Sequence, residues 1–384
     1  MHQSAALTIP EPHRTADRTA LPRPAAPAPS LSFRQPIPRE MVHRAAVAEV
    51  FLTDAVQVGE DRFLVAAQWP RDHALYHPDR SGVSDPMLFA ETIRQTLVYL
   101  AHEFHGVPLS HRFIGGDMDF EITDPEALRV GAAPVPVVLE TRWASEGTRT
   151  PKRYGMRIEA VLTVDGRPCG RGSLRVVAVD ERRYGLLRGR SDAMGAALSR
   201  ALLPPDGYGA HRMPPAAVGR LRAKDSVLAR GAGAGEWGLE LDLDHAILFD
   251  HPSDHAPLMA LLEGFRQLGH HLALDASGRG RAAWEAVADL AAGADAAAPP
   301  RLLSLTTACL AFGELDRPIR LVVREDRPDP ARSGVRRFGI DAVQGDCTLA
   351  TSTTHWSLPA APGLSVHREL RGGRQQVPHV LNAC

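Results

Sequence analysis

The sequence contains little cysteine and no excess of charge of either sign. Its four cysteines, Cys169, Cys309, Cys347 and Cys384, are widely spaced and form no C-x-x-C pair. They therefore indicate neither a zinc site nor a disulfide framework. The 44 lysines and arginines nearly balance the 45 aspartates and glutamates, which gives a net charge of -1. This balance predicts that neither nucleic acid nor a membrane surface is a partner.

Long apolar runs are also missing. No segment approaches about 18 consecutive apolar residues, and the N-terminal region lacks the apolar stretch of a signal peptide. We therefore expect a protein that neither spans a membrane nor is exported, with the cytoplasm as its simplest location. The composition, 44% hydrophobic and 23% charged over 384 residues, is typical of one large or two modest globular domains.

Proline is concentrated at the N-terminus. Residues 1–40 hold eight of the 31 prolines and show neither helical nor strand periodicity. This pattern predicts a disordered tail. An arm that docks onto a partner in extended form is the alternative.

The rest of the chain contains an internal repeat. His73 and His245 are each followed, 18 residues later, by a Glu-x-x-Arg-Gln signature, and the two copies are offset by 172 residues. The other matches occur in the same order: Val42-His43-Arg44 with Val218-Gly219-Arg220, and Arg153-Tyr154-Gly155 with Arg337-Phe338-Gly339. The repeat predicts a tandem duplication with halves at 41–185 and 216–384, joined by a linker at 186–215.

Each half is predicted to contain one long helix and several strands. The first helix begins at Asp85-Pro86, with a good N-cap followed by a favoured first residue, and ends near Phe104; its copy begins near 254–257. Both helices are apolar on most faces, which indicates burial on all sides. The predicted strands are Ala45–Thr53, Phe63–Trp69, Val135–Trp143, Ile158–Val164, Ser173–Val179, Ile319–Arg324, Phe338–Val343 and Thr348–Thr354. Asp165-Gly166 is a predicted hairpin turn, and 281–298 a predicted extra helix. We expect an α+β protein, a tandem hot-dog in which an antiparallel sheet wraps a central helix twice.

Polar residues interrupt the apolar helices. Glu91, Arg94 and Gln95 project from one side of the first helix, and Glu263, Arg266 and Gln267 repeat them in the second. A local ion pair on a solvated helix is the structural alternative. Because these helices are otherwise apolar, we expect the charges to be partly buried, where they need partners or a use.

A polar loop precedes each helix. The first is 77–82, and the second, 250–255, holds two histidines and two aspartates. These groups can titrate, donate hydrogen bonds or bind metal. No H-E-x-x-H spacing appears, so we expect no metal site. Asp254 is also a good helix N-cap.

These motifs together resemble the A-factor biosynthesis (AfsA-type) family of γ-butyrolactone signal synthases. The resemblance rests on 249–263 with Arg266-Gln267, on Val42-His43-Arg44 and Val218-Gly219-Arg220, and on the Asp85-Pro86-Met87-Leu88 stretch with Glu91 and Arg94-Gln95. It extends from residue 41 to nearly the end. One departure is Leu258, where the family more usually has glycine, which narrows the space at the helix start.

The resemblance implies an acyltransferase. Such an enzyme joins a β-ketoacyl thioester, carried by acyl carrier protein or coenzyme A, to dihydroxyacetone phosphate. Cyclisation to a phosphorylated butenolide follows, on the way to a γ-butyrolactone or furan hormone that controls antibiotic production. No further cofactor is implied, and a monomer or a homodimer is expected.

This reaction needs a base, and it needs cations for a phosphate and an oxyanion. Glu263 is the predicted base, because partial burial raises the pKa of a carboxyl group. Arg266 would orient Glu263 or hold a phosphate or thioester oxygen, and the helix N-terminus near Pro257 offers N–H groups. The candidate catalytic residues are Glu263, Arg266, Glu91 and Arg94, and the candidate substrate-binding residues are His251, Asp254, His255, Gln267, Gln95 and His77.

Three other functions stay open from the sequence. Hot-dog dehydratases resemble the chain more distantly; their catalytic histidine lies 14 residues before the helix glutamate, where this sequence has Phe249 in one half and His77 in the other. The phenylalanine argues against dehydration in the second half, whereas His77 with Glu91 keeps such a pair possible in the first. A thioesterase and a non-catalytic acyl-binding protein are the remaining alternatives.

Overall fold

A computed structural model of the protein describes residues 30–150, 152–198, 211–277 and 299–358. The predicted tail up to residue 29 and the helix predicted at 281–298 lie outside these ranges. Residues 31–40 belong to the folded unit, because Ile37 is buried and its N–H donates to the carbonyl of Leu52 at 3.0 Å. The described contacts therefore begin before residue 41, and the predicted domain boundaries stay predictions.

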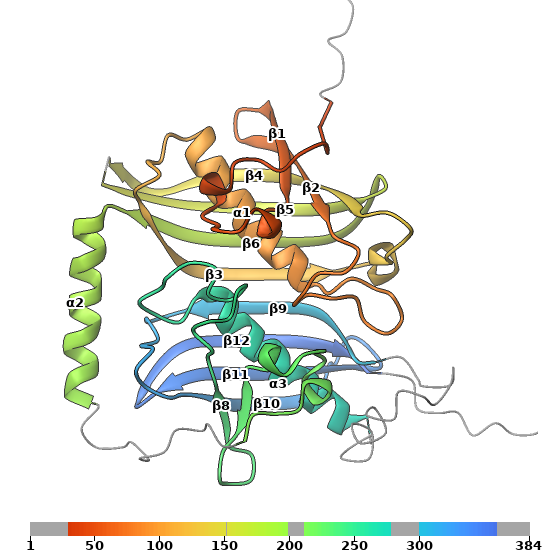
Figure 1. Ribbon diagram of the computed structural model, residues 1–384, viewed down its shortest axis with the longest axis vertical. Helices are drawn as coiled ribbons and strands as arrows, with labels where there is room; N and C mark the ends of the chain where they lie inside the picture. Colours follow the sequence, from red (N-terminus) through yellow and green to blue (C-terminus); the bar gives the residue numbers. More distant parts are fainter. Residues whose placement is uncertain (1–29, 151, 199–210, 278–298, 359–384) are drawn as a thin grey trace, which may run out of the picture. The chain divides into compact units, whose positions relative to one another are not determined.

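Within the described residues, twelve strands form one antiparallel sheet (Figure 1). Its order is β1-β2-β4-β5-β6-β3-β9-β12-β11-β10-β8-β7. The strands are β1 (Leu52–Gly59), β2 (Arg62–Trp69), β3 (Arg112–Ile122), β4 (Val135–Thr150), β5 (Arg153–Val164), β6 (Arg167–Val179), β7 (Leu228–Arg230), β8 (Trp237–Leu239), β9 (Arg301–Cys309), β10 (Ile319–Pro328), β11 (Val335–Gln344) and β12 (Cys347–Ser357). The first six come from the first half of the chain and the last six from the second.

The two halves meet at β3 and β9, in the middle of the sheet. These strands pair antiparallel from Asp117 opposite Ala308 to Glu121 opposite Ser304. Arg301 also lies 3.1 Å from Asp79. The sheet therefore runs without interruption from one half to the other.

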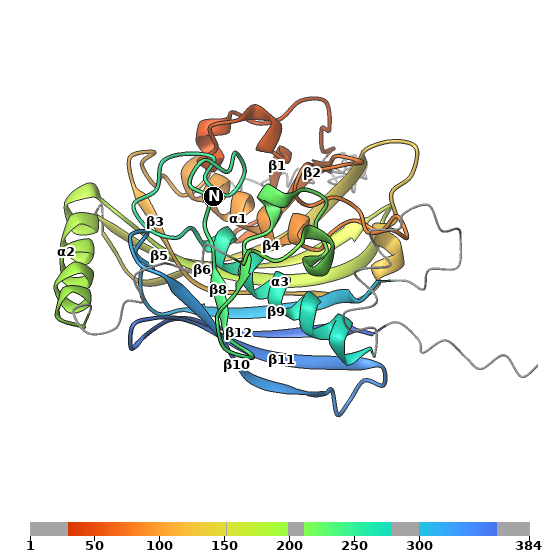
Figure 2. The ribbon, with the colours of Figure 1, turned by 60° about the horizontal axis from the view of Figure 1, so that its bottom comes forward.

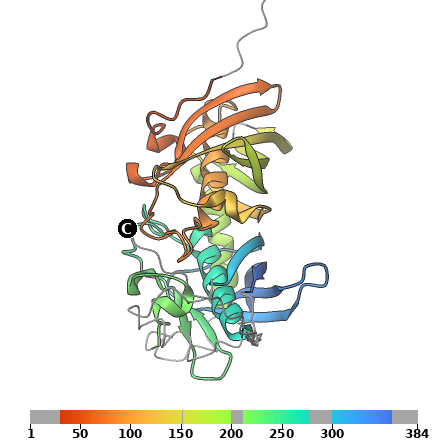
Figure 3. The ribbon, with the colours of Figure 1, turned by 90° about the vertical axis from the view of Figure 1, so that its right-hand side faces the viewer.

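Two long helices lie on the same face of this sheet (Figures 1 and 3). Helix α1 (Met87–Glu103) belongs to the first half and α3 (Leu258–Ala276) to the second. The segments that precede each helix lie over its other side, so both helices are enclosed (Figure 2). This enclosure explains why the helices are apolar on most faces, and the layout confirms the predicted tandem hot-dog.

Local signals explain the first helix. Asp85 accepts from the N–H of Met87 at 2.9 Å, as an N-terminal cap does, and Pro86 precedes the helix. The predicted turn at Asp165-Gly166 is also confirmed, because both residues have positive φ (49° and 73°), as a two-residue hairpin turn requires.

One prediction of local structure is wrong. Ala45–Thr53 was predicted as a strand, but β1 begins at Leu52, since the N–H groups of Ala45 and Ala46 donate to Asp250 instead of to a neighbouring strand. The linker predicted from residue 186 lies partly in helix α2 (Glu181–Leu198), and residues 199–210 lie outside the described ranges. The predicted strands elsewhere are confirmed, most of them with longer bounds.

Candidate active site

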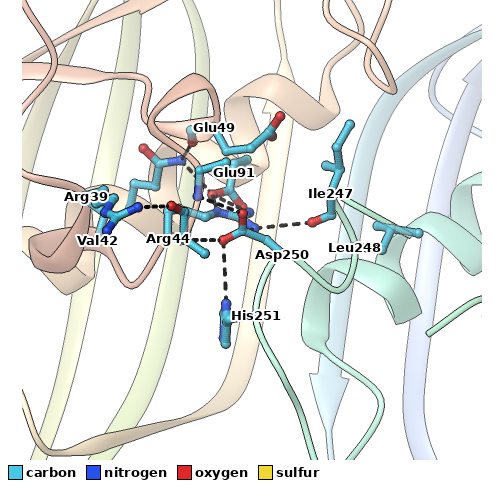
Figure 4. A network of polar contacts seen from close by, with 12 residues as sticks. Arg39, Val42, Arg44, Glu49, Glu91, Ile247, Leu248, Asp250 and His251 are labelled. Atoms are coloured by element: carbon cyan, nitrogen blue, oxygen red, sulfur yellow. Dashed lines mark hydrogen bonds and ion pairs between the residues drawn. The ribbon is translucent and has the colours of Figure 1, made fainter. Parts of the chain in front are cut away.

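The first half contains a buried ion-pair cluster around Glu91 of α1 (Figure 4). Arg44 donates from Nε to Oε1 of Glu91 at 3.0 Å, and its Nη2 lies 2.7 Å from the same oxygen. Arg94, one turn along the helix, donates from Nε to Oε2 at 2.9 Å and from Nη2 to Oε1 at 2.8 Å. The carboxylate therefore lies between two guanidinium groups.

These contacts fix the charge of Glu91. Burial by itself raises the pKa of a carboxyl group, because the anion loses its hydration. The charges and hydrogen bonds of Arg44 and Arg94 outweigh this effect and lower the pKa of Glu91 to about 2. Glu91 is therefore an anion at neutral pH that holds the two arginines in place.

The second half repeats the cluster around Glu263 of α3. Arg220, the counterpart of Arg44, donates from Nε and Nη2 to the two oxygens of Glu263 at 2.7 and 2.6 Å, and both side chains are fully buried. Arg266 lies 3.7 Å from Glu263 and donates to the carbonyls of Val218 at 2.7 Å and Gly219 at 3.1 Å. We expected Glu263 to be a base ready to accept a proton, but both its oxygens are held by Arg220.

Gln95 and Gln267 have matching structural contacts. Gln95 accepts from the N–H of Phe51 at 2.9 Å and donates to the carbonyl of Glu49 at 2.7 Å. Gln267 repeats both bonds with Val227 and Asp225, at 2.8 and 2.7 Å. Each glutamine also donates to the glutamate one turn earlier, at 2.7 Å. The two amides therefore fix the chain segment that enters the sheet beside each glutamate.

A carboxylate from the opposite half completes each cluster. Asp85, just before α1, accepts from Nη1 of Arg220 at 2.7 Å and lies 3.4 Å from Arg266. Asp250, in the loop before α3, lies 3.9 Å from Arg44. We name Arg44, Glu91, Arg94 and Asp250 the first-half cluster, and Arg220, Glu263, Arg266 and Asp85 the second-half cluster. Burial raises the pKa of Asp85, but the charges of Arg220 and Arg266 outweigh it, so this pKa lies at about 2.

A histidine from the opposite half also accompanies each cluster. His251 follows Asp250, with 3.6 Å from its Nδ1 to a carboxylate oxygen of that residue, and its side chain is 53% exposed. Burial, together with the charges of Arg44 and Arg94, lowers the pKa of His251. Burial likewise lowers the pKa of His77. The hydrogen bond of this imidazole to the carbonyl of Pro78 raises it, and the charge of Arg220 lowers it further. Both imidazoles are therefore neutral at neutral pH.

Tyr76 lies where the two clusters approach each other. Its hydroxyl group is buried and has no hydrogen-bond partner in the described part of the chain. Burial is the main cause that raises its pKa well above 10.0, and the charges of Glu263 and Glu91 add to it. Tyr76 is therefore a neutral phenol between the two glutamates.

Asp254 and His255 have partners on α2 rather than in either cluster. Tyr184 donates to Asp254 at 2.6 Å, and Nδ1 of His255 lies 2.8 Å from the same carboxylate. Arg188 donates from Nε to Asp254 at 3.2 Å and from two nitrogens to Glu314 at 2.7 Å. Burial raises the pKa of Asp254, but these hydrogen bonds outweigh it and bring the pKa to about 2. The two residues thus anchor α2 to the loop before α3.

The structure sorts the predicted site residues into three places. Glu91, Arg94 and Gln95 gather with His251; Glu263, Arg266 and Gln267 gather with His77; and Asp254 and His255 lie apart with α2. Sequence reasoning missed the partners Arg44, Arg220, Asp85, Asp250 and Tyr76 as site residues. The repeated Val-x-Arg motif was the available signal for the two arginines.

His43, which precedes Arg44, is a further residue that was missed. It has an unusual positive φ of 51°, and its Nε2 lies 3.0 Å from Nε2 of His102. Burial lowers the pKa of His43 to about 3, and the charges of His102, Arg94, His251 and Arg112 contribute in that order. Each of these neighbours is a cation or an imidazole.

The arrangement provides fixed arginines and neutral histidines, which can bind an anion, stabilise an oxyanion and accept a proton. In the described part of the chain, no three His, Cys, Asp or Glu side chains gather as metal ligands would. Among the described helices, none is long and apolar enough to cross a membrane.

Comparison with known proteins places the chain in a family. The family model described as the A-factor biosynthesis hotdog domain matches twice, over residues 25–180 and 208–359. A 2-oxo-3-(phosphooxy)propyl 3-oxoalkanoate synthase of Streptomyces virginiae is 40% identical over 231 residues, which are 60% of this chain and 75% of the relative. A synthase of the same name from Streptomyces griseus is 31% identical over 60% of this chain and 74% of its own length.

Among solved structures, the 12:0-ACP thioesterase from Umbellularia californica is 10% identical, with a TM-score of 0.42 over 77% of this chain and 94% of that one. This likeness is too distant to inform the function. The two matches to one domain family cover most of the sequence and confirm the resemblance inferred from its motifs. The chain belongs to the A-factor biosynthesis hotdog-domain family.

Proposed function

We propose that the protein transfers a β-ketoacyl group from a thioester to the hydroxyl group of dihydroxyacetone phosphate. The observation that carries this proposal is the 40% identity to a relative named 2-oxo-3-(phosphooxy)propyl 3-oxoalkanoate synthase, three quarters of which the match covers. That name describes the ester of these two compounds. Cyclisation of the ester would give a phosphorylated butenolide, a precursor of a γ-butyrolactone or furan hormone that controls antibiotic production.

The transfer breaks one bond and forms another. The hydroxyl oxygen attacks the thioester carbonyl carbon, the base removes the hydroxyl proton, and the carbon–sulfur bond breaks. The sulfur leaves as a thiol after it takes up a proton. In the cyclisation, the carbon between the two carbonyl groups of the acyl chain loses a proton and attacks the ketone, and water leaves.

The two clusters contain groups that can stabilise negative charge and groups that can accept a proton. Glu91 and Glu263 each accept hydrogen bonds from arginines and hold them in place, so the arginines are the groups that stabilise negative charge on substrate. The neutral imidazoles of His251 and His77 are the groups that can accept a proton near neutral pH. The reaction as written requires no cofactor beyond the carrier of the thioester, which is acyl carrier protein or coenzyme A.

A reducing, cytoplasmic location is part of this proposal. Cys169, Cys309 and Cys347 are free thiols in the structure, as is usual for cytosolic proteins. The protein would act there as a monomer or a homodimer, without nucleic acid or membrane as a partner.

Thiol release from a β-ketoacyl thioester tests the proposal. The purified full-length protein is incubated with the thioester, with and without dihydroxyacetone phosphate, and mass spectrometry identifies the products. We expect thiol release that requires the phosphate, together with the mass of a phosphorylated ester or butenolide.

Each other outcome would overturn the proposal in favour of a named alternative. Release without the acceptor would indicate a thioesterase. If a β-hydroxyacyl thioester offered in its place lost water without thiol release, the protein would be a dehydratase. A β-ketoacyl thioester that is bound but unchanged would indicate an acyl-binding protein.

A further inference from the structure

The two clusters differ in how completely their arginines are bonded. All three nitrogens of Arg220 contact carboxylates, because Nε and Nη2 donate to Glu263 and Nη1 donates to Asp85. Arg266 is also fully engaged, with Nη1 and Nη2 on two carbonyls and Nε 3.4 Å from Asp85. In the second-half cluster, every guanidinium nitrogen therefore already contacts a partner within the described residues.

Arg94 differs from its counterpart Arg266. Its hydrogen bonds come from Nε and Nη2, to Glu91 and to the carbonyl of Val42. Among the described residues, Nη1 of Arg94 has no hydrogen-bond partner. The Arg94 side chain is 17% exposed, whereas that of Arg266 is 8% exposed. Arg94 thus keeps two N–H groups without a hydrogen-bond partner, on Nη1, in a side chain that is less buried than that of Arg266 and that Glu91 holds in place.

The neighbouring backbone explains the difference. In the second half, Gly219 occupies the position of His43, and a Cβ there would lie 2.8 Å from His270 and 2.9 Å from Arg266. His270 thus fills the space beside Arg266. In the first half, Val98 stands at the position of His270, and His43 lies in the loop instead. The imidazole therefore lies on the loop in the first half and on the helix in the second. The loop residue has a positive φ in both halves (51° and 66°).

The charged groups that act on His43 are two cations, Arg94 and Arg112, because His102 and His251 are neutral at neutral pH. Val42, whose carbonyl accepts from Arg94, precedes His43, and the groups that oppose its protonation are His102, Arg94, His251 and Arg112. The acids of this cluster face other partners: Glu91 accepts from Arg44 and Arg94, and Asp250 accepts from the N–H groups of Ala45 and Ala46. The side of Arg94 next to His43 therefore favours an anion.

We propose that Arg94, with His43 and His251, binds the phosphate group of a phosphorylated acceptor, and that the second-half cluster is a closed structural counterpart. The chemistry fits, because a guanidinium donates charge-assisted hydrogen bonds to phosphate oxygens and a neutral imidazole donates one more through its N–H group. The identity of the acceptor rests on the proposed function; the anion site itself rests only on the contacts above.

Binding without turnover tests this assignment. Dihydroxyacetone phosphate is titrated into the full-length protein by calorimetry, with no thioester present. Arg94→Ala is expected to weaken binding at least tenfold, because a charge-assisted hydrogen bond to phosphate contributes about that much. His43→Gly copies the second half and suits the positive φ, and we expect it to weaken binding severalfold.

Matched variants keep the test decisive. Arg157→Ala removes an exposed arginine paired with Glu159 on β5, and it should bind the phosphate as the wild type does. Arg94→Lys keeps the charge and should bind with intermediate strength. Circular dichroism verifies that each variant is folded.

Two results would overturn the inference: wild-type affinity in both Arg94→Lys and His43→Gly, or an affinity loss that Arg157→Ala shares. Kinetics separate this inference from the proposed reaction. If the wild type binds the phosphate through Arg94 but transfers no acyl group, the reaction fails and the site stands. If it transfers the group, and Arg94→Lys and His43→Gly keep the wild-type KM for the acceptor, the phosphate site is overturned and the proposed reaction stands.

Discussion

At the scale of single residues, Arg220 is the buried cation that neutralises two buried carboxylates. It is fully buried and binds Glu263 of its own half and Asp85 of the other. Removal of one partner from such a cluster leaves uncompensated charges in a medium that solvates them poorly.

We therefore expect Arg220→Met to lower the free energy of unfolding by about 3–5 kcal/mol. Urea denaturation followed by circular dichroism measures this loss. Arg157→Met, at an exposed ion pair, should change the stability by less than about 0.5 kcal/mol. Equal effects of the two substitutions would show that the buried cluster does not stabilise the fold.

His43 should make stability depend on pH. Burial, with the neighbouring charges of His102, Arg94, His251 and Arg112, lowers its pKa to about 3 in the folded protein, against 6.5 in an unfolded chain. The unfolded state binds the proton first, so this contribution is present above pH 6.5 and is lost as the pH falls toward 3.

His43→Gly should flatten the pH dependence of the unfolding free energy between pH 6.5 and 3. Denaturation curves at several pH values provide the measurement. Glu91 contributes separately, because its pKa of about 2 lies below the ordinary 4.5, so its stabilisation is lost only below pH 4.5. Parallel curves for wild type and variant above pH 4.5 would contradict the role given to His43.

Tyr76 offers a test of a buried group without a partner. Its hydroxyl group lost its hydration on folding and gained no hydrogen bond among the described residues. Tyr76→Phe removes that group and keeps the ring, so we expect unchanged or higher stability, by up to about 1 kcal/mol. A thermal melt decides, and a clear drop in Tm would mean that the hydroxyl group has a stabilising partner.

The sequence predicted half of each cluster. Glu91, Arg94 and Gln95 stand out because charged side chains on an apolar helix need partners. Asp85 was predicted only as a helix cap, because Arg220 lies 135 residues away and no local pattern connects the two. Asp250 reaches Arg44 over a still longer separation in the sequence, so only the folded chain shows that each half supplies a carboxylate to the other.

At the scale of elements, helices α1 and α3 were predictable, whereas helix α2 and the two central strands β3 and β9 were not. Helix α1 has its own start signal in Asp85-Pro86. Its apolar stretch is also longer than a typical strand, which favours a helix. Strand β3 contains Gly115 and Gly116, and β9 lacks clear alternation, so neither has the pattern of a strand. Pairing with each other and with long neighbours stabilises them.

Close packing of α1 on β6 depends on Gly172. A Cβ there would lie 2.6 Å from the carbonyl oxygen of Asp119 and 2.7 Å from the side chain of Ile93. Gly172→Ala should therefore destabilise the protein by about 1–3 kcal/mol, because the helix must move away from the sheet. Urea denaturation measures the change.

Gly131→Ala is the control for this substitution, since nothing lies within 4 Å of its Cβ position and its φ is not positive. It should leave the stability nearly unchanged. If both alanine variants behaved alike, close contact between α1 and β6 would not limit the packing.

At the scale of the whole molecule, the repeat predicted two similar halves but not their dependence on each other. Separation of the halves would expose the β3–β9 edge and leave Arg220 without Asp85 and Asp250 without Arg44 and its backbone donors. A state with one half unfolded therefore loses several kcal/mol in buried charge alone.

We expect α1 and α3 to open together. Hydrogen exchange measured by mass spectrometry, at a pH where exchange outpaces reclosing, should show the peptides of both helices exchange in one correlated step. The edge strand β1, which pairs on one side only, serves as the control and should exchange earlier by local opening. Exchange of α3 while α1 stays protected would mean that each half is stable alone, and that the carboxylates shared between the halves serve the site rather than the fold.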